Sequence, residues 1–179
     1  MATTYTLISS NVLASNAASV TFSSIPSTYT DLKVVWSART SNAGNFDGLQ
    51  VSFNGTSSVY SSIILIGKYA NNTVTSTVYA SENPMWSNGN IMIDSATNTA
   101  STFGSGELYL PNYTSSANKP ASAISVCETN STSSLTGFIT DVANLIRITS
   151  AITSMTFTSA NAANFVTGSS FYLYGIKSS

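Results

Sequence analysis

Histidine is absent from this chain of 179 residues. Its absence removes the side chain that most often acts as a general base at neutral pH and the commonest protein ligand of transition metals. Catalysis by Ser-His-Asp or Cys-His groups is therefore excluded. A serine activated by lysine would need both side chains in one dry site, and the only Lys-Ser neighbours in the sequence are Lys177 and Ser178, at the end of the chain.

Charged residues are scarce, with six basic and seven acidic side chains and a formal net charge of -1. The acids are spread singly, whereas a glycosidase needs two carboxyl groups about 5–10 Å apart and calcium needs several oxygen ligands together. The stretch NAGNFDG at 42–48 comes closest to a calcium loop, and we interpret it as a Gly/Asn/Asp hairpin loop. The sequence predicts a protein that is not an enzyme and holds no cofactor or metal.

Only one cysteine occurs, Cys127, so no internal disulfide can form. Its surroundings, AISVCET, alternate as in a β-strand and place no base or positive group beside the thiol. We therefore interpret Cys127 as a small residue of a sheet rather than a reactive thiol.

The chain also lacks basic runs, long apolar runs and a secretion signal. Without a basic run there is no site for a nucleic-acid backbone. The longest apolar run, IILIG at 63–67, is far shorter than the roughly 20 residues that a membrane helix needs. The N-terminus, MATTYTLISS, has neither the basic nor the apolar region of a signal peptide. We expect no nucleic-acid partner, no membrane insertion and synthesis in a cytoplasm.

Hydrophobic residues, by contrast, make up 42% of the chain, which is enough to build a core. Small hydroxyl side chains are equally prominent, with 34 serines and 24 threonines, and must solvate surfaces that Lys and Glu usually cover. A chain of this length suits one domain that buries roughly 70% of its unfolded surface. The composition predicts a single domain spanning 1–179.

Apolar residues alternate with polar ones along much of the chain, which is the pattern of half-buried strands. In DLKVVWSAR, Leu32, Val34 and Trp36 fall on one side; in LQVSFNG, the apolar set is Leu49, Val51 and Phe53. Asn54-Gly55 then predicts a tight hairpin turn. Further candidate strands are 3–9, 18–24, 59–68, 73–80, 91–94, 106–110, 121–128, 135–141, 151–158 and 169–177.

Turn clusters between these segments, and loops of unequal length, favour a sandwich of about eight to ten strands over an up-and-down barrel. We expect an all-β, single-domain, jelly-roll-like antiparallel β-sandwich. Its core should hold the two apolar sets above together with Met155, Phe157 and Leu173. The last segment, FYLYGI, is apolar on both sides, as in a central strand of a sandwich.

Three segments carry a family resemblance: YTLISSNVLASNAASVTFSSIPSTYTDLKVVWSAR at 5–39, SAITSMTF at 150–157 and GSSFYLYGIK at 168–177. Together they resemble small virion structural proteins of tailed bacteriophages, particularly those of marine and cyanobacterial hosts. The resemblance covers both ends of the chain well and the middle weakly. It implies no catalytic residues.

The resemblance implies a place on the virion surface, most of all as a capsid decoration or cement protein. The partners would be the major capsid protein or other virion proteins, and we expect a homo-oligomer, first of all a trimer. The alternatives are a tail-fibre or receptor-binding module, or a carbohydrate-binding module that recognises a host surface glycan. The aromatic residues that could form a sugar platform are Tyr69, Tyr79, Trp86, Tyr109 and Tyr113.

The stretch SENPMWSNGN at 81–90 places Met85 and Trp86 in what reads as a loop. One hypothesis is that the loop folds back and Trp86 covers the end of the core. The other is that Met85 and Trp86 are an exposed apolar anchor, because Met and aromatic residues are enriched at interface centres. The sequence leaves both hypotheses open and makes these two residues the candidate interface.

Overall fold

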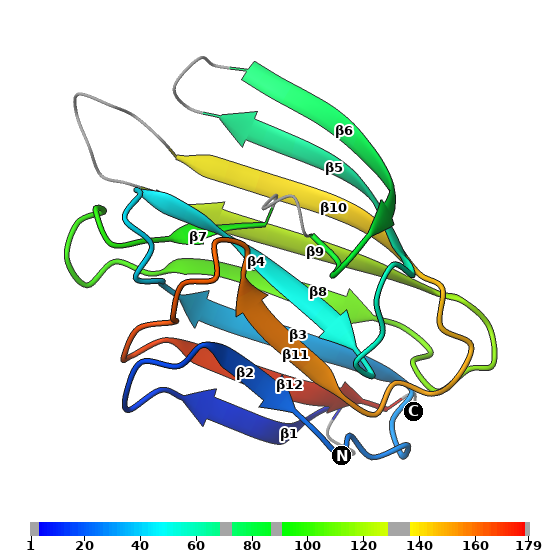
Figure 1. Cartoon of the computed structure of the whole chain (residues 1–179). Coiled ribbons are helices and arrows are strands. Elements are labelled where there is room, and N and C mark those ends of the chain that lie inside the picture. Colours follow the sequence, from blue (N-terminus) through cyan, green and yellow to red (C-terminus); the bar gives the residue numbers. More distant parts are fainter. Residues whose placement is uncertain (1–3, 69–72, 87–90, 129–136, 178–179) are drawn as a thin grey trace.

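Two antiparallel β-sheets pack face to face to form the molecule (Figure 1). The computed structural model describes residues 4–68, 73–86, 91–128 and 137–177. None of the described residues belongs to a helix that could cross a membrane. The fold is therefore the all-β sandwich that the sequence predicts.

Twelve strands occur in the described residues, and each overlaps a segment expected from the sequence. In chain order they are β1 Tyr5–Val12, β2 Ser19–Phe22, β3 Asp31–Ala38, β4 Phe46–Phe53, β5 Tyr60–Lys68, β6 Thr73–Glu82, β7 Ile91–Asp94, β8 Gly104–Leu110, β9 Lys119–Cys127, β10 Phe138–Ile146, β11 Met155–Ser159 and β12 Ser170–Ile176. This exceeds the eight to ten strands that we expected.

Eight of the strands have the order of a jelly roll. One half of the larger sheet runs β1-β12-β3-β8, and the smaller sheet runs β2-β11-β4-β7. The first and last strands are neighbours, and the chain passes repeatedly from one sheet to the other. β12 lies between β1 and β3, which agrees with the apolar character of both sides of FYLYGI.

The other four strands are two inserted hairpins that widen the larger sheet. The β5–β6 hairpin lies between β4 and β7 in sequence, and the β9–β10 hairpin lies between β8 and β11. They continue the sheet in the order β8-β9-β10-β5-β6. Figure 1 shows β5 and β6 extending past the smaller sheet, while β10 still contacts it through Phe138, which packs on Phe46 of β4.

The core lies between the sheets and contains the residues that the alternation predicts. Leu32, Val34, Trp36, Leu49, Val51, Phe53, Met155, Phe157 and Leu173 are all buried. Ring contacts connect them, including Trp36 with Phe157 at 6.4 Å between ring centroids. The period-two pattern therefore identified the buried side of these strands correctly.

The turn at Asn54-Gly55 forms, but the hairpin predicted there is wrong. Both residues have positive φ, 52° and 65°, and the Thr56 amide donates to the Phe53 carbonyl at 3.0 Å. However, β4 and β5 lie in different sheets. The Tyr60 hydroxyl, which accepts from the Phe53 amide at 2.9 Å, fixes this crossing from one sheet to the other.

The predicted hairpin loop at 42–48 is also a crossing between sheets, from β3 to β4. β4 already begins at Phe46, and the Asp47 side chain is buried. Its carboxylate accepts hydrogen bonds from the hydroxyls of Thr40 and Ser159, each at 2.7 Å, and from the Asn161 amide at 2.8 Å. Asp47 therefore joins the ends of three strands.

Candidate interaction surface

Met85 and Trp86 do not lie on the surface, since both have an exposed fraction of 0%. The Met85 backbone exchanges two hydrogen bonds with Val51 of β4, at 3.0 and 3.1 Å. The Trp86 ring packs against Trp36, with 6.3 Å between ring centroids. Of the two hypotheses for this stretch, the structure agrees with the loop that folds back. The exposed anchor is wrong.

A buried polar cluster explains why this segment folds inward. The Trp86 indole Nε1 donates to Asn144 Oδ1 of β10 at 2.8 Å. The Ser62 hydroxyl of β5 lies 3.0 Å from the same Asn144 oxygen and also contacts the Glu82 carboxylate. The segment thus covers the inner side of β5 and of the part of β10 around Asn144. The rest of the stretch, 87–90, lies outside the described residues.

The buried acids of the chain support loops and strand ends. Arg39 is buried near Asp94, and its guanidinium donates to four backbone carbonyls within 96–102 at 2.6–3.2 Å. Burial raises the pKa of Asp94, although a hydrogen bond from Asn98 acts in the opposite direction. No group of three His, Cys, Asp or Glu side chains among the described residues could hold a metal ion.

Two further reactive side chains are also buried. The Cys127 thiol is buried at the end of β9, and burial raises its pKa to about 12, which fits the interpretation as a small sheet residue. Lys119 is fully buried, and its ammonium donates to the carbonyls of Ser115, Ala117 and Ile148 at 2.7–3.0 Å. Burial lowers the pKa of Lys119. Both residues therefore support the fold at the start and end of β9.

An exposed apolar surface covers the outer side of the four added strands. Eight large aliphatic side chains point outward there, with exposed fractions between 37% and 75%. We call these eight residues the outer apolar face: Ile63 and Leu65 of β5, Val74 and Val78 of β6, Ile124 and Val126 of β9, and Ile139 and Leu145 of β10.

Strand register makes this surface continuous. Ile63 lies opposite Val78 across β5 and β6, and Ile139 lies opposite Val126 across β10 and β9. Asp141 of β10 is the one charged residue at the outward positions of these four strands in the described chain. Monomeric proteins rarely expose a continuous apolar patch of more than a few hundred Å², and such patches commonly mark interaction sites.

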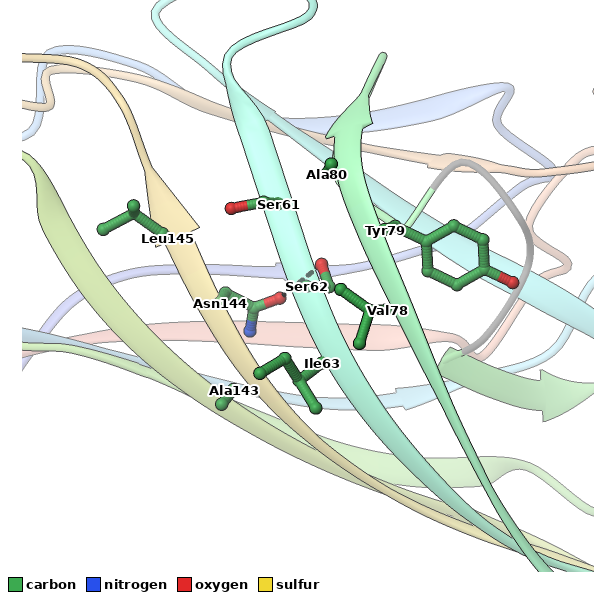
Figure 2. Close-up of a pocket in the computed structure, with 9 residues that line it drawn as sticks. All are labelled: Ser61, Ser62, Ile63, Val78, Tyr79, Ala80, Ala143, Asn144 and Leu145. Carbon is green, nitrogen blue, oxygen red and sulfur yellow. Dashed lines mark hydrogen bonds between the residues drawn. The ribbon is translucent and has the colours of Figure 1, made fainter.

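A shallow hollow of about 420 Å³ lies within the outer apolar face. Figure 2 shows its lining residues on three neighbouring strands, β10, β5 and β6. Small residues form its floor, namely Ser61, Ala80 and Ala143, while Ile63, Val78 and Leu145 stand beside them. The hollow could therefore accept an apolar side chain of a partner protein.

The outer side of the other half of the same sheet is more polar. Lys33 of β3 forms an ion pair with Glu107 of β8 at 2.8 Å. Beside them, the Tyr109 hydroxyl donates to the Asp31 carboxylate at 2.7 Å. Of the exposed large hydrophobic residues that the structure describes, three lie in this half, namely Tyr5, Leu7 and Val12 of β1, and the other eight lie on the added hairpins.

The four described residues of the proposed sugar platform do not form one. Trp86 and Tyr113 are fully buried, and Tyr79 and Tyr109 are half-buried on different strands. Tyr69 lies outside the described residues. The structure therefore brings none of the four described rings together on an open surface.

Comparison of the chain with protein-family models, curated proteins and solved structures finds no match.

The outer apolar face was not identified from the sequence, although a signal was present. In YSSIILIGK the residues Ile63 to Ile66 are all apolar, so one of the two alternating sets had to point away from the core. In β6, Val74 and Val78 alternate with threonines. That alternation alone would have placed the valines inside.

Proposed function

We propose that this protein is a non-enzymatic structural protein of a bacteriophage virion, where it decorates the capsid surface and attaches through the outer apolar face. The likeness of both chain ends to small virion proteins supports the virion role. The absence of histidine and the structural use of Asp47, Glu82 and Asp94 support a role without catalysis.

The observation that carries the proposal is the outer apolar face itself. Removing apolar surface from water lowers the free energy by about 25 cal/mol per Å². Covering these side chains with a partner therefore favours association. The face is nearly uncharged, so its partner must present an uncharged, mainly apolar protein surface. A strand-rich or loop surface of the major capsid protein is the partner we assign to it.

Binding to particles assembled without this chain tests the proposal. Purified protein should bind such particles to saturation with a fixed number of copies per capsid, as measured by co-sedimentation and electron cryo-microscopy. Binding to tails alone would assign the protein to a tail instead. Binding to glycans on an array, with no binding to particles, would show a carbohydrate-binding module and contradict the proposal.

A further inference from the structure

β6 forms one edge of the larger sheet and has a paired strand, β5, on one side only among the described residues. The strand is ten residues long, and its register with β5 is continuous from Thr73 to Tyr79. Both of its sides are open to solvent over most of that length. The backbone N–H and C=O groups along the free side can therefore pair with another strand.

Natural proteins usually protect an edge strand with charges, proline, a bulge or a covering segment. From Thr73 to Ser81, β6 contains no charged residue, no proline and no glycine. Both edge strands have one register irregularity: in β1 it lies between Leu7 and Ser9, and in β6 it lies after Tyr79, near the end of the strand. The stretch of β6 from Thr73 to Tyr79 is therefore a regular edge without such protection.

The sequence of β6 is complementary to itself in the antiparallel direction. When two copies meet with Ser76 on the two-fold axis, Val74 lies opposite Val78 of the other copy on the outer side. On the inner side, Thr75 then lies opposite Thr77. Pairs of β-branched side chains stabilise antiparallel strands, and no like charges face each other in this register.

We infer that β6 is a self-association site, at which two copies join their larger sheets edge to edge through antiparallel β6–β6 pairing centred on Ser76. The partner is a second copy of this chain. The pairing joins the two outer apolar faces into one surface of double width. It requires a dimer in solution, in place of the trimer expected from the sequence, and does not depend on the proposed attachment to a capsid.

A cysteine at the axis tests the register. Residues directly opposite each other have Cα atoms about 4.5–5.5 Å apart, which suits a disulfide. Ser76→Cys should therefore form a covalent dimer on mild oxidation. Val74→Cys is the matched control on the same side of the same strand. Its two copies would lie about 13 Å apart and should not cross-link. Wild-type protein, with its buried Cys127, should also remain uncoupled.

Sedimentation velocity tests the β6–β6 pairing without a cross-link. Wild-type protein should be a dimer at micromolar concentration, and Ser76→Lys should raise the dissociation constant about fivefold or more, because two like charges meet at the axis. Ser122→Lys, on β9 away from the edge, should not change it. A wild-type monomer, a trimer, or equal cross-linking of Ser76→Cys and Val74→Cys would overturn the inference, whatever the outcome of particle binding.

Discussion

Trp86 shows how one side chain supports a part of the sandwich that no strand covers. Its ring packs on Trp36, and its indole nitrogen donates to Asn144 of the added hairpin. Trp86 has a positive φ of 65°, a backbone region that costs free energy for a large side chain. The contacts with Trp36 and Asn144 offset that cost. The residue therefore connects the jelly-roll core with the added strands.

Truncation of Trp86 should destabilise the whole protein. Trp86→Ala should lower the free energy of unfolding by about 3–5 kcal/mol, because a fully buried ring is replaced by a cavity. Trp86→Phe keeps most of the packing and loses the bond to Asn144, so the loss should be about 1–3 kcal/mol. Urea unfolding measures both values. An unchanged midpoint for Trp86→Ala would contradict the buried position.

Because the pKa of Asp94 is raised, its contribution to the free energy of unfolding should depend on pH. Because burial raises its pKa in the folded state, the folded protein holds the proton more tightly than the unfolded chain. The stabilisation from this proton is present at low pH and is lost as the pH rises through the folded pKa.

Comparison with Asp94→Asn isolates this effect. The free energy of unfolding of the wild type, minus that of Asp94→Asn, should fall as the pH is raised from about 3 toward neutrality. Urea titrations across that range measure the difference. A difference that stays constant or increases with pH would show that burial does not dominate at Asp94.

At the scale of elements, the sequence predicts strands well and their partners poorly. Alternation in DLKVVWSAR and LQVSFNG marks the buried side of β3 and β4, because one side of each strand faces the core. The same alternation does not say which sheet a strand joins. Asn54-Gly55 therefore predicted the turn correctly and the hairpin wrongly.

Long-range contacts explain the other differences. β10 extends to Ile146, whereas the predicted segment ended at Asp141, because a polar Asn144 interrupts the apolar series. In the fold, Asn144 is buried and bonded to Trp86, which is distant in sequence. The sequence left the burial of Met85 and Trp86 open for the same reason. Nothing in the local sequence shows that the inner side of β5 and β10 has to be covered by this segment.

Gly106 of β8 packs closely against β3, which predicts that a larger residue there destabilises the fold. A Cβ atom at Gly106 would overlap the Ile124 carbonyl oxygen and the Trp36 ring. Gly106→Ala should therefore lower the free energy of unfolding by about 1–3 kcal/mol. Gly44→Ala, in the loop before β4, meets no atom closer than 3.2 Å and should change it by less than about 1 kcal/mol. Equal effects of the two substitutions would contradict the packing of Trp36 against β8.

For the whole molecule, the scarcity of charge determines how it can attach to a partner. Among the described residues, Asp141 is the one charged side chain that points outward beside the outer apolar face. The chain as a whole has a net charge of -1. Attachment must therefore rely on apolar contacts and neutral hydrogen bonds, which salt does not screen.

Binding to particles should change little with ionic strength. Between about 0.01 and 0.15 M salt, where the Debye length falls from about 30 to 8 Å, we expect the dissociation constant to change less than about twofold. Titration of the labelled protein against particles at both salt concentrations measures it. A tenfold loss of affinity would show that the interface is electrostatic.

The most direct test of the attachment through the outer apolar face compares how two variants bind to particles. In each variant one exposed aliphatic residue is replaced by lysine. Ile63 lies in the outer apolar face and is 54% exposed, and Leu7 lies on β1, the opposite edge strand of the same sheet, and is 50% exposed. Ile63→Lys should weaken binding about tenfold or more, the effect of about 1.4 kcal/mol, while Leu7→Lys should bind like the wild type. Both variants should keep the wild-type unfolding midpoint, since neither side chain is in the core. Equal binding by the two variants, or a loss confined to Leu7→Lys, would contradict attachment through the outer apolar face.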